Sequence, residues 1–282
     1  MSEPATEFVV RRILIALDAS ASSLAALKAA VRLAAELGAD LEGLFVEDAN
    51  LVRIATLPVA RRVLFPSAAE EPLDSSCMER ELKALARHAQ RSLAALAEHS
   101  GIRWTFRVVR GKVPAEILAA ASESDLLTVG CSGWSLARRM QMGSIAQNAA
   151  MNAPKALLLV KQPLDVDRPV VVLFDGSPLA AQALRAAARF TSAFQSRLTI
   201  FILAESAENA RTLMQRAAHL LKEDEVEASF RPVFTAGALQ LADAIESEAG
   251  GLLVLCRKYS RVSENEIQEL VRRVGNPVLL VR

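Results

Sequence analysis

Cysteine and histidine are scarce in this chain of 282 residues, which contains three of each. Cys77, Cys131 and Cys256 stand far apart and form no C-x-x-C pair. This spacing argues against a disulfide framework and a structural zinc site, and it fits a reducing compartment. His88 and His99 share one predicted helical stretch, with no pattern of ligand residues near them. The sequence therefore predicts no metal site built by protein side chains.

An excess of one charge and long hydrophobic runs are also missing. The chain has 33 Lys and Arg against 32 Asp and Glu, a formal net charge of +1. Such a balance produces no field that would favour nucleic acid or an anionic membrane. Apolar runs such as 156–160 are far shorter than a spanning helix, and the first twelve residues do not resemble a secretory signal. We therefore expect a soluble cytoplasmic protein, with neither nucleic acid nor a membrane as partner.

Apolar residues make up 52% of the chain, enough at this length for two domains. The continuous apolar run that ends at Asp18 predicts a buried parallel strand, and helical spacing over 22–37 and 78–99 predicts amphipathic helices between strands. Such alternation predicts an open parallel sheet that binds ligands where its strand order reverses. The proline-containing segment 47–76 is predicted to be irregular, either an insertion over a surface, of a kind that often lines a site, or a partly disordered segment.

The segment 125–145 runs from an apolar strand through a glycine-containing loop into a predicted helix. Gly130, Gly133, Gly143 and Ser144 have the spacing G-x2-G-x9-G-S, which matches neither the Walker loop nor the dinucleotide fingerprint. Glycines let backbone N–H groups approach an anion, and a helix starting at Ser144 adds unpaired amides. The pattern therefore indicates phosphate binding. The alternative is an ordinary turn, followed by a helix that Ser144 caps.

This spacing, with Asp18 at the end of the first strand, resembles the nucleotide loop of the ATP-binding branch of the universal stress protein family. The resemblance covers most of residues 11–160 and returns more weakly over 168–282. It implies an α/β fold of two tandem open parallel five-stranded sheets with helices on both faces, Rossmann-like and similar to the adenine nucleotide alpha hydrolases. It also implies that the first copy binds ATP, with Mg²⁺ arriving only as part of the nucleotide complex.

The resemblance further implies roles for individual residues in a crevice between the first and fourth strands. Asp18 would meet the adenine, and Val46 would contact the base or ribose. Gly130 and Gly133 would pass under the ribose and phosphates, which residues 143–145 would hold. The complete implied binding set is Ala16, Asp18, Val46, Val129, Gly130, Gly133, Gly143, Ser144 and Ile145.

Three assignments near this crevice stay open. Asp18 is a helix cap in an alternative interpretation, because aspartate is common at that position. Arg138 and Arg139 either pair with phosphate or are simply solvated. Cys131 lies near a helix start, but nothing in the sequence indicates a lowered thiol pKa.

The second half repeats the pattern without the glycine loop. Asp175 again follows an apolar strand, but after Cys256 no glycine occurs until Gly275. We therefore divide the chain into a nucleotide-binding domain, 1–163, and a degenerate second domain, 164–282. Members of the family typically pair through the last strand, which implies an internal pseudo-dimer here and leaves a further homodimer open.

These features predict a stress-response regulatory protein that binds an adenine nucleotide with slow or no turnover. From Gly130 to Ile145 there is no Asp, Glu or His to activate water or hold Mg²⁺. Two alternatives stay open. One is a slow ATPase or nucleotide-dependent phosphotransferase that uses the same crevice, and the other is an interaction scaffold in which the loop is vestigial.

Overall fold

The computed structural model describes residues 8–57, 59–64, 69–131, 143–222, 224, 226–234, 237–248 and 250–282. The elements of the first half are β1 (Arg12–Leu17), α1 (Ala21–Leu37), β2 (Asp40–Asp48), α2 (Ala49–Ala55), β3 (Arg61–Leu64), β4 (Ala69–Pro72), α3 (Ser75–His99), β5 (Trp104–Gly111), α4 (Val113–Ala121), β6 (Leu126–Gly130), α5 (Ser144–Asn152) and β7 (Ala156–Val160). Those of the second half are β8 (Val170–Phe174), α6 (Pro178–Phe194), β9 (Leu198–Leu203), α7 (Ala207–Leu220), β10 (Ala228–Val233), α8 (Ala238–Ser247), β11 (Leu252–Cys256), α9 (Glu264–Arg273) and β12 (Val278–Val281).

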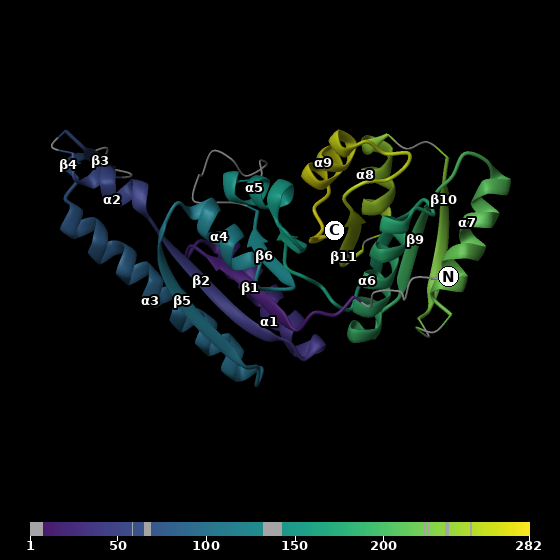
Figure 1. Ribbon diagram of the computed structural model, residues 1–282, viewed down its shortest axis with the longest axis horizontal. Helices are drawn as coiled ribbons and strands as arrows, with labels where there is room; N and C mark the ends of the chain where they lie inside the picture. Colours follow the sequence, from purple (N-terminus) through teal and green to yellow (C-terminus); the bar gives the residue numbers. More distant parts are fainter. Residues whose placement is uncertain are drawn as a thin grey trace.

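Ten of these strands form one continuous sheet, in the order β10-β9-β8-β11-β12-β7-β6-β1-β2-β5. In each half, five parallel strands follow one another in the same order, and the halves join where β12 pairs antiparallel with β7 (Figure 1). The predicted α/β fold is confirmed, but the two expected five-stranded sheets are fused edge to edge. Fusion has a physical reason, because β7 and β12 are buried throughout, and an open apolar edge would be prone to aggregation.

Helices cover both faces of this sheet. In one layer α1 packs against α3 and α6, and α6 against α7; in the other, α4 packs against α5 and α8 against α9 (Figure 1). The core lies between these layers and the strands, and its largest side chains include Phe174, Phe190 and Leu93. None of the helices in the described ranges combines the length and hydrophobicity needed to cross a lipid bilayer.

In each half, the cation that directly follows the last strand caps the last helix of the other half. Lys161, directly after β7, donates from Nζ to three backbone carbonyl oxygens at the C-terminal end of α9. Arg282, directly after β12, donates to three carbonyl oxygens at the C-terminal end of α5. The last carbonyl groups of a helix have no partner inside it, and they form the negative end of its dipole. The exchange therefore caps both helices and fastens the halves together.

Part of segment 47–76 is regular, which corrects the expectation of an irregular insertion. Asp48 begins α2, since its carboxylate accepts the N–H of Asn50 at 2.8 Å. Further on, β3 and β4 pair antiparallel, with Arg61 opposite Pro72. Four-residue strands leave too short an alternation for a sequence pattern to reveal. This segment extends from the β5 edge of the sheet (Figure 1).

Candidate functional site

A cavity of about 600 Å³ opens at the carboxyl ends of β1, β2 and β6. Because β1 lies between β2 and β6, the strand order reverses at this point, where open parallel sheets bind their ligands. Its volume is within the range of small-molecule sites. The lining residues are Ala16, Leu17, Asp18, Ser22, Ser23, Leu44, Phe45, Val46, Asp48, Leu51, Met78, Glu81, Leu82, Leu85, Val113, Ile117, Val129, Gly130, Gly143, Ile145 and Ala146.

Most of the predicted binding residues meet on this wall. Those present are Ala16, Asp18, Val46, Val129, Gly130, Gly143 and Ile145. Ser144 is the first residue of α5, between two wall residues, and its side chain lies outside the described part of the chain. Gly133, Arg138 and Arg139 also lie outside the described residues. The structure therefore groups these residues as expected, while their binding role stays a prediction.

Asp18 begins the tight turn that joins β1 to α1. Its Oδ1 accepts the N–H of Ser20 at 2.9 Å, and Ala19 between them has a φ of 61°. The cap of α1 is Ser20, whose hydroxyl oxygen accepts the N–H of Ser23 at 3.1 Å. The alternative in which Asp18 caps the helix is therefore wrong. Its carboxyl group shapes the turn and lies at the cavity wall.

Gly130 ends β6 at a point where the strand touches the start of α1. A Cβ atom there would lie 2.6 Å from the carbonyl oxygen of Ser22 and 3.0 Å from the nitrogen of Ser23. Both are backbone atoms, so a side chain would push α1 away from β6. Gly130 thus has a packing reason besides the predicted access for phosphate. Beyond it, the N–H of Gly143 donates to the carbonyl oxygen of Cys131 at 2.9 Å, which brings the residues on either side of 132–142 together.

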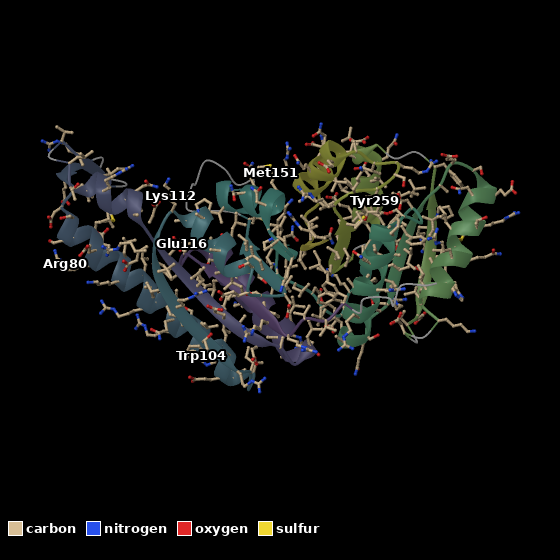
Figure 2. All side chains as sticks on the ribbon, in the orientation of Figure 1. Arg80, Trp104, Lys112, Glu116, Met151 and Tyr259 are labelled. Atoms are coloured by element: carbon tan, nitrogen blue, oxygen red, sulfur yellow. The ribbon has the colours of Figure 1, made fainter. Side chains whose placement is uncertain are left out.

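Two helices begin at the cavity without a side-chain cap. The N-cap of α5 is Gly143 and that of α4 is Lys112, and neither side chain accepts a hydrogen bond from the first turn (Figure 2 shows Lys112). The φ of Gly143 is −61°, so this position does not require glycine. Because the N-cap of α5 is Gly143, the alternative in which Ser144 caps this helix is wrong. By contrast, α1, α2 and α3 each have a capping side chain. An uncapped helix N-terminus is suited to bind an anion. The first turn of α4 contains Glu116, whereas that of α5 contains no acidic residue, so α5 is the better suited of the two.

Six wall residues that the sequence analysis did not assign to the site come from the end of β2, from α2 and from α3. They are Asp48, Leu51, Met78, Glu81, Leu82 and Leu85. The amphipathic pattern of 78–99 predicted the helix but not which of its ends meets the sheet. The signal that could have suggested them is their position in and just after an insertion next to the second strand, a place where insertions often line a site.

Arg110, at the carboxyl end of β5, fixes the start of α3 beside the cavity. Its guanidinium group lies 2.8 Å from the carboxylate of Glu47 and 3.0 Å from that of Glu79. Hydrogen bonding to Glu47 raises the pKa of Arg110, and Glu79 adds to the effect. Because Glu47 is buried, it needs such a partner. The ion pairs therefore join β2, β5 and α3 where the insertion meets the site.

At the corresponding position of the second half, protein groups occupy the crevice. Asp175 repeats the turn, since its Oδ1 accepts the N–H of Ser177 at 2.9 Å, but its other oxygen accepts the N–H of Ser260. Tyr259 is buried there, and its hydroxyl oxygen accepts the N–H of Cys256 at 3.0 Å (Figure 2). Burial raises the pKa of Tyr259 well above its ordinary value of 10. The phenol therefore stays neutral and fills this position.

The helix that corresponds to α5 also differs in its first turn. In α9, Ser263 accepts the N–H of Glu266, and the Glu266 carboxylate accepts the N–H of Ser263, which forms a capping box. The hydrogen bond from the Ser263 backbone lowers the pKa of Glu266, so this carboxylate is ionised at neutral pH. An anionic ligand at the start of α9 would meet a negative charge there.

Cys131 does not have the environment of a reactive thiol. It is buried at the end of β6, and burial raises its pKa to about 11, although the charge of Lys161 acts in the opposite direction. Only the thiolate is a good nucleophile. The thiol of Cys131 is therefore protonated at neutral pH.

A parallel sheet with helices on both faces and a cavity at the reversal of strand order defines the class of Rossmann-like α/β proteins. The chain belongs to the universal stress protein family, because the sequence model of this family matches residues 10–161, more than half of the chain. It is similar to a universal stress protein of Methanocaldococcus jannaschii, with 27% identity over 159 residues, 56% of this chain and 85% of that protein.

Two crystal structures share the fold over nearly the whole chain. A universal stress protein from Archaeoglobus fulgidus matches with a TM-score of 0.73 and 15% identity, covering 96% of this chain and 98% of that one. A functionally unknown protein from Pseudomonas aeruginosa matches with a TM-score of 0.61 and 13% identity, covering 97% and 93%. Both halves of the sheet therefore have counterparts in solved proteins.

Proposed function

We propose that this protein is a regulatory member of its family that binds ATP in the first-half cavity. One observation carries the proposal: the predicted nucleotide residues meet on one cavity wall, where α5 begins with neither a side-chain cap nor an acidic residue in its first turn. Apolar wall residues such as Val46 and Leu85 suit the face of a purine. Asp18 offers an acceptor to the amino group of the base or to a ribose hydroxyl. The N-terminus of α5 suits the phosphates.

The charges of the phosphates need cations as well. The described wall includes no lysine or arginine, so we assign this role to Arg138 and Arg139 in the loop between Cys131 and Gly143. Among the described residues, no group of three or more His, Cys, Asp or Glu is placed to hold a metal ion. In this proposal Mg²⁺ enters bound to the triphosphate.

We also propose that the chain is a duplication, with domains 1–163 and 164–282 and a second domain that no longer binds nucleotide. The shared strand order and the repeated turns at Asp18 and Asp175 support the duplication. The buried Tyr259 and the capping box of α9 support the loss of binding. In this proposal the β7–β12 pairing makes the chain an internal pseudo-dimer.

Calorimetric titration of ATP into two matched variants tests the proposal. Ile145→Glu places a carboxylate at the cavity end of α5, where it suits the helix dipole but repels phosphate. Gln147→Glu adds the same charge to the same helix at an exposed position away from the cavity. We expect at least a tenfold weaker affinity in Ile145→Glu and near-normal affinity in Gln147→Glu. Equal affinity in both would refute the site. Failure of the unchanged protein to bind ATP would favour the scaffold alternative.

A second candidate function is slow ATP hydrolysis, which one observation favours. The loop lacks carboxylates, but the fold brings Glu81 and Asp48 to the cavity wall. A carboxylate near the phosphates can position or deprotonate a water molecule. Phosphate release that Glu81→Gln abolishes, while the distant exposed Glu123→Gln retains it, would support this function. Recovery of intact ATP after long incubation would exclude it.

A further inference from the structure

A second, smaller cavity of about 270 Å³ lies between the two halves, where α5 faces α9 and β12. Its floor is apolar and consists of Ala150, Met151, Ile267, Val271 and Leu280. Met151, half exposed, stands at the end of α5 on the side toward α9 (Figure 2). We call this space the α5–α9 groove. It is separate from the nucleotide cavity, with which it shares no lining residue.

Two arginines converge on one side of the groove. Arg257 donates from Nη2 to the carbonyl oxygen of Met151 at 3.1 Å, and Arg282 donates from Nη1 to the same oxygen at 3.3 Å. These acceptors are neutral carbonyl groups. Among the described residues, neither arginine forms an ion pair with a carboxylate. The groove therefore keeps a net positive charge at this side.

The environment of Arg282 is unfavourable in two respects. Its Nε atom is buried and has no hydrogen-bond acceptor in the described part of the protein. Burial lowers the pKa of Arg282, and the nearby charge of Arg257 lowers it further. A buried donor without a partner costs free energy, and so does a pair of like charges. An anion beside the two guanidinium groups would relieve the repulsion.

The other walls limit the chemistry of that anion. A fully hydrated ion such as sulfate would leave the apolar floor unused. Two more charged residues line the groove: Arg272, whose guanidinium group lies 3.6 Å from the carboxylate of Glu269, and Glu264. The negative charge of Glu264 favours a ligand with one negative charge over a phosphate dianion. The volume lies just below the usual range for drug-sized ligands, so the apolar body must be short.

We propose that the α5–α9 groove binds a small organic monoanion, a carboxylate with a short aliphatic or aromatic body. The carboxylate lies against Arg257 and Arg282, and the apolar body lies on Val271 and Leu280. This inference does not depend on nucleotide binding, since it rests on a different cavity.

Calorimetric titration of the full-length protein with three matched probes tests the class of ligand. Octanoate has both the charge and the apolar body, 1-octanol has the body alone, and acetate has the charge alone. We expect octanoate to bind at least tenfold more tightly than either of the others. Octanol binding as tightly as octanoate, or no octanoate binding up to its limit of solubility, would overturn the proposal.

Two arginine variants locate the site. Arg257→Gln removes a charge from an exposed side chain with one hydrogen bond to the protein, so the fold should be unaffected. Arg261→Gln is the control, because Arg261 lies on the same loop but pairs with Glu205 outside the groove. We expect Arg257→Gln to weaken octanoate at least tenfold and Arg261→Gln to leave it unchanged. If both variants bound octanoate with equal affinity, or if octanoate competed with ATP in the unchanged protein, octanoate would bind outside the α5–α9 groove.

Discussion

At the scale of single residues, Asp125 shows how one carboxylate fixes the base of the first half. Its Oδ2 accepts the N–H groups of Arg11 and Arg12 at 2.9 and 3.1 Å, and its Oδ1 lies 3.3 Å from Nζ of Lys155. Burial alone would raise the pKa of Asp125, but the two backbone hydrogen bonds and Lys155 outweigh it, so the pKa is lowered. The carboxylate therefore joins the start of β1 to the start of β6.

This lowered pKa gives a prediction for stability against pH. Ionised Asp125 stabilises the folded state at pH values above the ordinary aspartate pKa of 3.8, and the effect is lost as pH falls through the lower folded-state value. Urea unfolding should show Asp125→Ala to be less stable by about 1–3 kcal/mol at neutral pH. The difference should shrink below pH of about 4. A difference that stays constant down to strongly acidic pH would contradict this account.

Gly130 and Gly143 make a matched pair, because a Cβ at Gly130 would meet backbone atoms of α1, whereas the φ of Gly143 is −61°. In Gly130→Ala the new Cβ would meet the backbone of Ser22, and we expect a loss of about 1–3 kcal/mol in the free energy of unfolding. Gly143 has a φ that alanine adopts readily, so Gly143→Ala should retain its stability. Denaturant unfolding of both variants checks this. If Gly130→Ala were as stable as Gly143→Ala, α1 would be able to move away from β6 at no cost in free energy.

Residue-level prediction succeeded where the sequence pattern is local. Asp18 and Gly130 follow continuous apolar strands, so their place at the carboxyl edge of the sheet could be read directly. The alternative interpretation assigned the cap of α1 to Asp18 instead of Ser20. Both side chains of this Asp-x-Ser turn accept backbone hydrogen bonds, and only their geometry shows which one caps the helix. Glu81 was missed because a helical pattern does not say which turn of the helix faces the site.

At the scale of elements, the exchanged caps make α5 and α9 depend on the opposite half. Lys161 is substantially buried, and burial lowers its pKa, yet it donates to three carbonyl groups of α9. We expect Lys161→Met to lower the free energy of unfolding by about 2–4 kcal/mol, because those carbonyl groups, two of them partly buried, lose a charged donor. Lys155→Met, which removes an exposed ion pair, should cost within about 1 kcal/mol.

Chemical denaturation of these two lysine variants provides the measurement. A cost for Lys161→Met no larger than that for Lys155→Met would show that the exchanged cap contributes little to the joining of the halves. Faster hydrogen exchange at the C-terminal end of α9 in Lys161→Met would locate the effect.

Tyr259 permits a graded test of the filled crevice. Tyr259→Phe keeps the ring but leaves the buried N–H of Cys256 without its acceptor, so we expect a loss of about 1–3 kcal/mol. Tyr259→Ala also removes the ring and should cost about 3–5 kcal/mol. Thermal or urea unfolding measures both. A cost for Tyr259→Ala no greater than that for Tyr259→Phe would show that the ring fills no tightly packed space.

Elements with strong periodicity were predictable, and short ones were not. The helix predicted over 78–99 is observed as 75–99, and the strand over 11–18 as 12–17. The hairpin of β3 and β4 was missed because each strand has only four residues. In physical terms, β3 and β4 are held by pairing with each other, and pairing leaves little trace in the order of apolar residues.

At the scale of the whole molecule, the pairing of β7 with β12 determines which surfaces remain. The family resemblance implies association through the last strand, and here that strand is engaged within the chain in both halves. A homodimer would therefore have to use another surface. The edges of the ten-stranded sheet are β5 and β10, and β5 alternates exposed with half-buried residues. The joining itself could not be derived from periodicity, because an apolar strand fits the centre of any sheet.

The unequal halves are the basis of the central claim, that nucleotide binds in the first half alone. Cross-linking the full chain with 8-azido-ATP, followed by peptide mapping by mass spectrometry, tests this most directly. The account predicts label on peptides that line the first-half cavity, such as those containing Val46 or Ile145, and loss of label when excess ATP is present. Label confined to peptides of residues 164–282, or label that excess ATP does not displace, would contradict it.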